Sequence, residues 1–393
     1  MTRPLRIVHV YNWLDPANGG PPRVIAGLVA GQQALGHDVR LISSDHPGAE
    51  PVDHLLGAHL TRRPPRTTVR PKFFYPILTR RALTAALKGA DVAHLHGIWP
   101  PVTLLASQVC RRLGVPYVLA PHGSLHGAAL GEKRPRKLVG MWLLGYGRLV
   151  KHASALHVLN TDEAGGADLP AVSGVVLPER VEVIPNGVFP EVFVEPDNPL
   201  PFRRHFPEVG DGPYVLFLSR LHPGKGCALL ADAFGAVARA RPDARLVVVG
   251  QDHGGQAAFE AGAERHGYGD RLHLIGPLFD HRKHAALRGA AVFCLPSHHE
   301  GFSMAITEAL AWGRPVVISE ACHFPEVTTH GCGFETPLEP GAIARRLLEV
   351  LADPKEATAM GARGRALVLS RYTWPRIAER TITLYRRVIE APS

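Results

Sequence analysis

The stretch Pro296–Glu308 carries two carboxylates, Glu300 on an expected loop and Glu308 in the helix that follows. An ionised carboxylate only accepts hydrogen bonds and a sugar hydroxyl can donate one, so this pair suits a ribose or a hexose. Glu308 lies among apolar residues such as Met304 and Ile306, where an unpaired carboxylate is costly. The alternative is that Glu308 faces water or pairs with an arginine.

Two further segments combine glycine with cations or with a helix start. Arg220 and Lys225 stand in Ser219–Gly226, between an apolar run and a helix, where a guanidinium fork and an ammonium suit a diphosphate. The alternative is a pair of solvated loop cations. Gly19 and Gly20 precede another helix, whose unpaired N–H groups favour an anion, with a plain tight turn as the alternative. The spacing is not Gly-x-Gly-x-x-Gly, so the dinucleotide fingerprint is absent.

Histidines are frequent, with 22 in the chain. His122 directly follows an apolar run, where it can bond a sugar hydroxyl or serve as a satisfied structural histidine. His94 and His96 alternate along one expected strand and share a face, which is a weak metal pattern without carboxylates at ligand spacing. We therefore expect no protein-bound metal and no cofactor.

The elements that position these residues follow from short apolar runs that alternate with helical patterns. Such runs are typical of parallel strands buried on both faces, and the alternation predicts βαβ units. Ligands bind outside the carboxyl ends of such strands, so the residues after each run are the expected site. We expect strands at 5–10, 39–43, 92–96, 117–120, 156–159 and 181–184, and at 214–218, 246–249, 272–275, 292–295 and 316–318.

Two such series predict an α/β fold with two Rossmann-like, doubly wound parallel-sheet domains, which suits a chain of 393 residues. A stretch rich in proline and acidic residues, 189–207, marks the boundary. The expected domains are 1–192 and 193–372, and an amphipathic helix occupies most of 373–393.

Composition excludes several classes of protein. The chain is 46% hydrophobic and 20% charged, which argues against extensive disorder. Five scattered cysteines without CxxC spacing argue against a disulfide framework and favour a reducing cytoplasm. No secretion signal is visible, and no run approaches the roughly 20 apolar residues of a spanning helix. We therefore expect a soluble, cytoplasmic protein.

The net charge of +9 lies mostly in residues 1–192, with 21 Lys/Arg against 13 Asp/Glu. Within 133–151, cations stand beside tryptophan and leucines, a composition that suits an anionic bilayer surface. A solvated basic face over ordinary core residues is the alternative. We expect peripheral attachment to the inner face of the plasma membrane, and no nucleic-acid binding, because no recognised module is visible. The residues concerned are Lys133, Arg134, Arg136, Lys137 and Trp142.

In their order and spacing these motifs resemble the retaining GT-B glycosyltransferases, in particular glycosyltransferase family 4. The E-x7-E signature of that family is formed by Glu300 and Glu308, and the resemblance spans almost the whole chain. It implies two domains that face each other across a cleft, with the terminal helix crossing back onto the first. The other matching segments are Gly19-Gly20, His94-Leu95-His96-Gly97, Pro121-His122-Gly123, Ile184–Val188, Ser219–Gly226, Gly313–Val317 and Trp374–Tyr385.

The resemblance also implies roles for individual residues. Arg220 and Lys225 would neutralise the diphosphate, Glu300 would bind the donor sugar, Glu308 the ribose, and His122 would lie beside the sugar. The implied catalytic residues are His122, Arg220, Lys225 and Glu300. The family keeps the anomeric configuration of the donor and generally needs no metal. The implied donor-binding residues are Gly19, Gly20, Asn186, Gly301, Phe302, Ser303, Met304 and Glu308.

The expected activity is transfer of a hexosyl unit from a nucleotide-diphosphate sugar to a hydroxyl of a glycan or lipid-linked saccharide, in surface polysaccharide biosynthesis. Pro121–Lys151 resembles the acceptor region of such enzymes. A soluble small-molecule acceptor, a catalytically idle GT-B binding scaffold and a sugar-nucleotide epimerase are the alternatives. Two departures concern local backbone contacts to the donor: Ser303 replaces a frequent glycine, and Glu320–Glu326 replaces a Gly-Gly turn.

Overall fold

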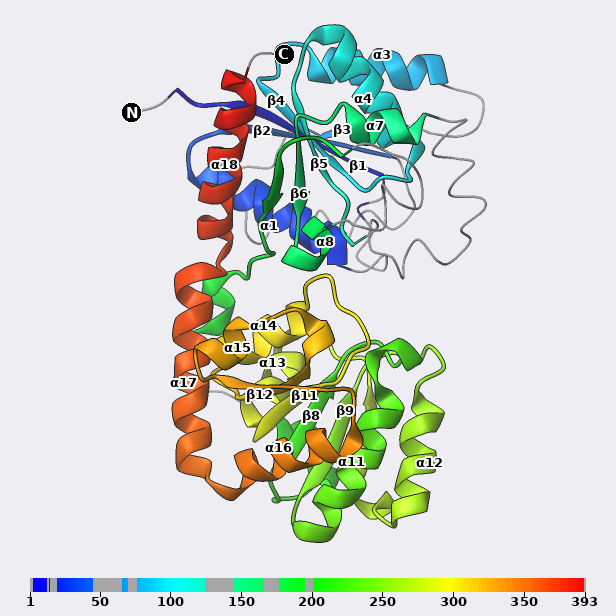
Figure 1. Cartoon of the computed structure of the whole chain (residues 1–393), viewed down its shortest axis with the longest axis vertical. Helices are drawn as coiled ribbons and strands as arrows, with labels where there is room; N and C mark the ends of the chain where they lie inside the picture. The colour runs from blue at the N-terminus through cyan, green and yellow to red at the C-terminus, as the bar shows by residue number, and fades with distance from the viewer. Residues whose placement is uncertain are drawn as a thin grey trace. The chain divides into compact units, whose positions relative to one another are not determined.

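The computed structural model describes residues 3–12, 14, 20–44, 66–69, 76–123, 145–165, 177–194 and 201–391. The chain divides into two compact units, residues 1–187 with 374–393 and residues 188–373. Each unit contains one sheet of parallel strands with helices on both faces (Figure 1). The expected α/β class with two Rossmann-like domains is therefore confirmed.

The sheet of the first unit has the strand order β3-β2-β1-β4-β5-β6-β7. The order changes direction between β1 and β4, and in open α/β sheets ligands bind at the carboxyl ends beside such a switch point. β4 is buried along its whole length, as a central strand covered on both faces must be. The strands are β1 (Arg6–Tyr11), β2 (Asp38–Ser44), β3 (Arg66–Val69), β4 (Val92–His96), β5 (Tyr117–Ala120), β6 (Ala155–Val158) and β7 (Val181–Val183).

The sheet of the second unit repeats this plan in the order β10-β9-β8-β11-β12-β13. Its switch point lies between β8 and β11, which pair in parallel through Val215 with Val292 and Leu216 with Phe293. The strands are β8 (Tyr214–Leu218), β9 (Arg245–Val249), β10 (Leu272–Gly276), β11 (Val292–Leu295), β12 (Val316–Ser319) and β13 (Gly333–Thr336).

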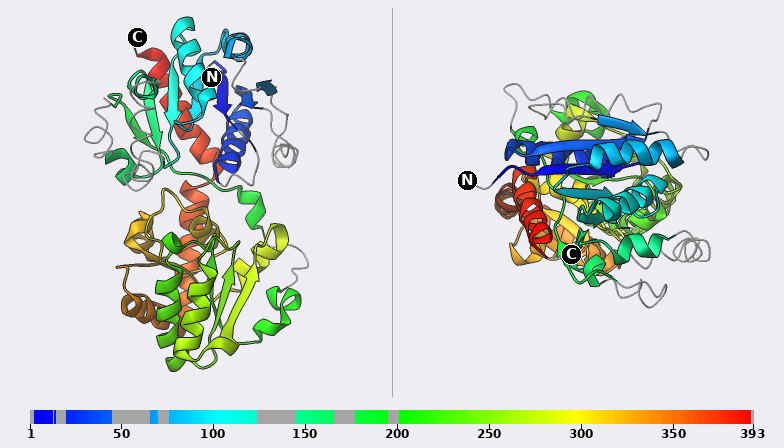
Figure 2. Two further views of the ribbon diagram at one scale, coloured as in Figure 1. Left: turned by 90° about the vertical axis from the view of Figure 1, so that its right-hand side faces the viewer. Right: turned by 90° about the horizontal axis from the view of Figure 1, so that it is seen from above.

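The C-terminal helix α18 (Trp374–Glu390) packs against α1 (Gly20–Ala34), although the two lie at opposite ends of the sequence (Figure 2). A Cβ atom at Gly27 of α1 would overlap the indole ring of Trp374, so glycine permits the close approach. The strong amphipathic pattern of α18 explains its helix and its buried face. The other helices of this unit are α3 (Pro76–Leu87), α4 (Pro101–Leu113), α7 (Tyr146–Lys151) and α8 (Thr161–Gly165).

The helices of the second unit form two packed groups, α11 with α12 and α16, and α14 with α13 and α17. They enclose a continuous apolar core around the sheet. The helices are α10 (Phe202–His205), α11 (Cys227–Ala240), α12 (Gln256–His266), α13 (Asp280–Gly289), α14 (Met304–Ala311), α15 (Glu326–Thr329), α16 (Pro340–Ala352) and α17 (Pro354–Arg371). Short 3-10 turns are η2 (Pro190–Phe193), η3 (Pro207–Val209), η4 (Pro223–Lys225), η5 (Gly269–Arg271) and η6 (Glu320–Cys322).

All the expected strands are present, and the structure adds two that the sequence pattern missed, β3 and β13. Both are four-residue strands at the edge of a sheet. An edge strand needs no continuous aliphatic run, because it lacks a neighbour on one side and part of it meets solvent. Arg-Thr-Thr-Val and Gly-Phe-Glu-Thr contain residues that favour strands, but they lack the aliphatic run that identified the other strands.

Candidate functional site

The clearest candidate site of the second unit lies where β8 and β11 end side by side. Lys225 follows β8 and Glu300 follows β11, and Lys225 Nζ lies 2.7 Å from Glu300 Oε1. Only 19% of the lysine side chain and 10% of the glutamate side chain are exposed. The structure therefore brings together two of the residues that the sequence predicted to be catalytic, at the switch point where ligands bind.

Backbone contacts hold the two loops of this pair against each other. The carbonyl oxygen of Gly224 accepts hydrogen bonds from the N–H of His298, at 2.9 Å, and from Ser297 Oγ, at 3.1 Å. Gly226 has a φ of +73°, and a Cβ atom there would overlap the carbonyl oxygen of Pro296. Glycine is thus required both for the left-handed backbone and for the close approach.

Glu308, on α14, forms an ion pair with Lys283 of α13. Lys283 Nζ lies 2.8 Å and 2.9 Å from the two carboxylate oxygens, and each side chain is 13% exposed. Sequence reasoning missed Lys283, since nothing in its own segment distinguishes it from the neighbouring Arg282. A carboxylate offers about four lone-pair sites, so Glu308 keeps acceptor capacity for hydroxyl groups.

The residues between the two carboxylates form the start of α14. Ser303 is the N-cap, and its side chain accepts a hydrogen bond from the N–H of Ile306 at 3.5 Å. This cap gives a physical reason for serine at a position where the family often has glycine. The ring of Phe302 packs against Phe324 and Tyr372, and Met304 opens the helix.

Arg220 is exposed directly after β8, and its carbonyl oxygen accepts a hydrogen bond from the N–H of His222. Gly20 is the first residue of α1, and Asn186 is buried after β7. Gly19 lies outside the described residues, as do Lys133, Arg134, Arg136, Lys137 and Trp142.

In the first unit, His122 follows β5 in a strained turn. Its φ of +52° lies in the left-handed region, which is uncommon for residues other than glycine and often marks a functional position. The N–H of the next residue, Gly123, donates to Glu163 Oε1 at 2.7 Å. The other carboxylate oxygen of Glu163 accepts from the N–H of Leu159 at 2.9 Å. A buried carboxylate therefore holds the turn that presents His122.

Sequence reasoning missed Glu163, although a local signal exists. Asn160 and Glu163 have the spacing of a capping box, and Asn160 Oδ1 accepts from the N–H of Glu163 at 2.6 Å. That pattern predicts a helix start. It does not reveal that the glutamate reaches across to a different strand end.

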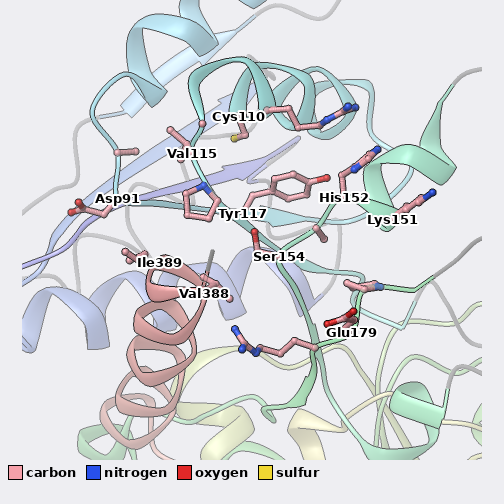
Figure 3. A pocket seen from close by; sticks show the side chains of 18 of the residues that line it. Asp91, Cys110, Val115, Tyr117, Lys151, His152, Ser154, Glu179, Val388 and Ile389 are labelled. Carbon is pink, nitrogen blue, oxygen red and sulfur yellow. The ribbon is translucent and has the colours of Figure 1, made fainter. Parts of the chain in front are cut away.

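A groove of about 1080 Å³ lies elsewhere in the first unit (Figure 3). Tyr117, Ser154 and Arg180, at the amino ends of β5, β6 and β7, contribute to its lining, together with Val388 of α18. The strands are parallel, so this edge of the sheet is opposite to the one that carries His122. The groove is therefore separate from the candidate site.

No helix in the described part of the chain combines the length and the apolar character that crossing a bilayer would require. The cysteines 110, 227, 294, 322 and 332 are all buried and unbridged. Burial raises the pKa of Cys227 and of Cys332 to about 11, which keeps both thiols protonated at neutral pH.

Two family profiles match the chain in succession. The family described as "Glycosyl transferase 4-like domain" matches residues 19–187, and "Glycosyl transferases group 1" matches residues 201–367. The second match contains Arg220, Lys225, Glu300 and Glu308. The first contains His122.

Similar proteins include enzymes that transfer mannose. The GDP-mannose:cellobiosyl-diphosphopolyprenol alpha-mannosyltransferase of Xanthomonas campestris is 27% identical over 406 residues, which covers 99% of this chain and 98% of that protein. The phosphatidyl-myo-inositol mannosyltransferase of Mycobacterium tuberculosis is 32% identical over 213 residues, which covers 52% of this chain and 53% of that protein.

Solved structures share the fold. Anabaena Alr3699/HepE in complex with UDP and glucose has a TM-score of 0.75 at 19% identity, with 97% of this chain and 99% of that chain covered. Sucrose-phosphate synthase from Thermosynechococcus elongatus has a TM-score of 0.68 at 22% identity, with 98% and 99% covered. With both glycosyltransferase profiles matched in chain order and the fold shared with solved structures, the chain is a GT-B glycosyltransferase, in which residues 19–187 belong to the glycosyl transferase 4-like family and residues 201–367 to the glycosyl transferases group 1.

Proposed function

We propose that this glycosyltransferase is a retaining, metal-independent hexosyltransferase that takes a hexose from a nucleotide-diphosphate sugar and adds it to a lipid-linked saccharide. The observation that carries the proposal is the ion pair of Lys225 and Glu300 at the switch point of the second sheet. The two residues stand at adjacent strand ends. The cation can neutralise a phosphate of the donor, and the carboxylate beside it can accept hydrogen bonds from the sugar.

The proposed reaction breaks the bond between the anomeric carbon and the diphosphate oxygen. A bond from the acceptor hydroxyl forms on the same face of that carbon, and the acceptor proton passes to the leaving phosphate oxygen. Arg220 and Lys225 stabilise the negative charge on the leaving diphosphate, because fixed cations need no reorganisation during the reaction. Glu300 offsets the positive charge that develops on the sugar.

The remaining residues bind the parts of the donor that do not react. Glu308 accepts hydrogen bonds from the ribose hydroxyls while Lys283 holds its carboxylate in place. His122 lies beside the donor sugar, as the family resemblance implies, and accepts a hydrogen bond from one of its hydroxyls. The relatives that transfer mannose make GDP-mannose the first donor to test, and their printed names support an acceptor carried on a lipid.

The test incubates the full chain with a panel of UDP-, GDP- and ADP-sugars and two acceptors. One acceptor is a saccharide on a short polyprenyl diphosphate, and the other is the same saccharide free in solution. We expect transfer to the lipid-linked acceptor, retention of the donor's anomeric configuration by proton NMR, and an unchanged rate in excess EDTA. An inverted product contradicts retention, and transfer only to the free saccharide contradicts the lipid-linked acceptor. If no sugar is transferred from any donor, the proposed activity is wrong.

We also propose that the enzyme attaches peripherally to the anionic inner face of the plasma membrane through the basic segment 133–151, where it would meet a lipid-linked acceptor. Its cations stand beside Trp142 and leucines. Near an anionic surface each cation contributes about 1 kcal/mol. Changing Lys133, Arg134, Arg136 and Lys137 together to alanine should therefore abolish flotation with vesicles of phosphatidylglycerol and phosphatidylcholine.

The matched control for flotation uses vesicles of phosphatidylcholine alone, which should not bind the wild-type chain. Equal flotation of the wild type and the fourfold variant would show that this segment is not the attachment site.

A further inference from the structure

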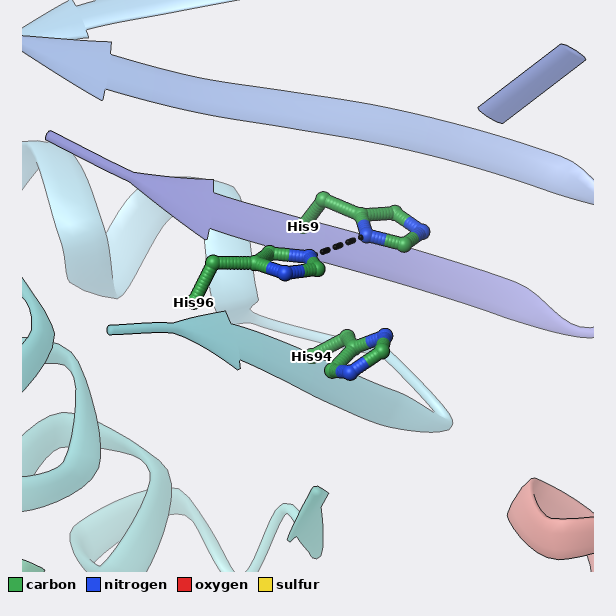
Figure 4. Close-up of side chains that lie close together, drawn as sticks. All are labelled: His9, His94 and His96. Atoms are coloured by element: carbon green, nitrogen blue, oxygen red, sulfur yellow. Dashed lines mark hydrogen bonds between the residues drawn. The ribbon is translucent and has the colours of Figure 1, made fainter. Parts of the chain in front are cut away.

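Five histidines form one hydrogen-bonded network inside the first unit. His9 lies on β1, His94 and His96 on β4, His157 on β6, and His122 after β5. All except the half-buried His122 are buried. Figure 4 shows the rings of His9, His94 and His96 gathered where β1 and β4 run side by side. A backbone carbonyl group at one end of the network determines the donor and the acceptor of each bond in turn.

The carbonyl oxygen of Ile184 can only accept, so His157 Nε2, which lies 2.8 Å away, carries a hydrogen. In a neutral ring the other nitrogen is then an acceptor. His157 Nδ1 therefore accepts from His94 Nε2 at 3.3 Å, which leaves His94 Nδ1 as an acceptor. The hydroxyl of Tyr385 lies 2.7 Å from His94 Nδ1 and must donate to it.

Gln32 on α1 connects this half of the network to the other half. The hydroxyl of Tyr385 has used its hydrogen, so it accepts from Gln32 Nε2 at 3.1 Å. The hydroxyl of Thr381 donates to the carbonyl oxygen of Ala378, so it also accepts from Gln32 Nε2 at 3.1 Å. These two acceptors determine the orientation of the amide, with Oε1 on the other side.

The direction of donation then continues to His122. Gln32 Oε1 accepts from His9 Nε2 at 2.8 Å, so His9 Nδ1 accepts from His96 Nε2 at 2.9 Å. His96 Nδ1 in turn accepts from His122 Nε2 at 2.9 Å. His122 Nε2 therefore carries the hydrogen, and His122 Nδ1 keeps a lone pair.

These hydrogen positions require neutral rings, and burial keeps the rings neutral. Burial lowers the pKa of His9 and of His157 to about 4, and burial together with neighbouring imidazoles lowers the pKa of His94 and of His96 well below the usual value. Burial, with the nearby His157, lowers the pKa of His122 to about 3. All five rings are uncharged at neutral pH.

We propose that Gln32 and Tyr385 are positioning residues, which set the tautomer of His122 so that its Nδ1 can only accept a hydrogen bond from a ligand hydroxyl. The identity of that hydroxyl as one of the donor sugar rests on the proposed function. The assignment of the tautomer does not depend on the proposed function. Tyr385 lies on the C-terminal helix α18. This helix therefore influences His122 through the buried groups of the network and not through contact with the ligand.

A metal ion is the rival explanation of this cluster. His9, His94 and His96 bring ring nitrogens within 4.8 Å of one another. However, both ring nitrogens of each of these three residues already have a hydrogen-bond partner in the network. An ion would have to break several of these bonds, so the network accounts for the cluster better.

The test is nitrogen-15 NMR of the histidine rings in the full chain without substrate. His122 is assigned by the signals lost in His122→Asn. In the wild type we expect an unprotonated Nδ1 and a protonated Nε2 at His122. In Gln32→Leu the amide that imposes the direction is absent, so His122 should show both tautomers. In Tyr385→Phe the amide loses one of its two acceptors and keeps Thr381, so a smaller share of the second tautomer should appear. A protonated Nδ1 in the wild type, or an unchanged tautomer in both variants, would refute the proposal.

Tyr117→Phe is the matched control, because Tyr117 is buried in the same unit and its hydroxyl donates to the carbonyl oxygen of Leu149 at 2.7 Å, outside the network. It should leave the His122 signals unchanged. A stoichiometric metal in the purified chain, measured by mass spectrometry, would favour the rival.

Kinetics separate this proposal from the proposed function. For sugar transfer, Gln32→Leu should lower kcat/KM roughly 3- to 10-fold relative to Tyr117→Phe, the size of one neutral hydrogen bond. If the NMR result holds and no sugar is transferred by the wild type, the positioning network stands and the assigned activity is wrong. If the wild type transfers sugar and both variants keep the wild-type tautomer, the activity stands and the positioning role is wrong.

Discussion

Replacing Glu300 with glutamine is expected to lower kcat/KM for sugar transfer by roughly 10³-fold while the chain stays folded, since one preorganised charged contact in an active site has about this effect. Glu300 is 10% exposed and pairs with Lys225 at 2.7 Å. The amide keeps the size of the side chain but no longer offsets positive charge on the sugar or on Lys225. The measurement is transfer rate against donor concentration, with the thermal midpoint recorded for each variant.

A double-mutant cycle tests whether Glu300 and Lys225 act together. Lys225→Met should cause a comparable loss, and the double variant should lose little more than either single variant, because the two residues act as a unit. Asp232→Asn is the control, since Asp232 pairs with Arg265 at 2.6 Å on an exposed surface of the same unit. An exposed ion pair contributes at most about 1 kcal/mol to stability, and Asp232 is not a residue of the candidate site. The Asp232→Asn variant should therefore keep the wild-type transfer activity. Fully additive losses, or an active Glu300→Gln, would contradict the prediction.

Replacing Gly226 with alanine is expected to destabilise the second unit by roughly 3 kcal/mol and to abolish most of the transfer activity. Two effects add. An L-residue at a φ of +73° is strained, and the new Cβ would overlap the carbonyl oxygen of Pro296. Relieving that overlap must separate the loops that carry Lys225 and Glu300. Urea unfolding and the transfer rate measure the two consequences.

Gly267→Ala separates backbone strain from overlap. Gly267 ends α12 with a φ of +68°, close to that of Gly226, but a Cβ there would meet no atom within 4 Å. We expect a loss of about 1 kcal/mol from strain alone and unchanged transfer activity. If the two alanine variants lose equal stability and both stay active, close packing at Pro296 is not what requires Gly226.

Local patterns predicted much of the fold. The aliphatic runs of the central strands, such as 246–249, were identified because strands buried on both faces need apolar side chains at nearly every position. The strands β3 and β13 were missed because they lie at the edges of their sheets, where a continuous apolar run is not required. Glu300 and Lys225, which the family resemblance assigns to the donor sugar and the diphosphate, lie side by side because both follow adjacent parallel strands.

The partners of individual side chains were much less predictable. Glu308 was expected to bind a ribose, face water or pair with an arginine, and the structure pairs it with Lys283. Glu163 holds the turn that contains His122 and Gly123. Gln32 and Tyr385 belong to the network that sets the tautomer of the His122 ring. None of these three residues stands in a motif that indicates such a role.

By itself the sequence determined most of the strands, and which glycines, cations and carboxylates follow them, because these depend on residue type and on spacing within one element. Only the tertiary structure decided which charge meets which and how the histidine hydrogens are arranged. Lys225 and Glu300 are 75 positions apart, and Gln32 and Tyr385 are 353 apart. Contacts over such separations exist only once the sheets and helices have packed, so no local pattern can encode them.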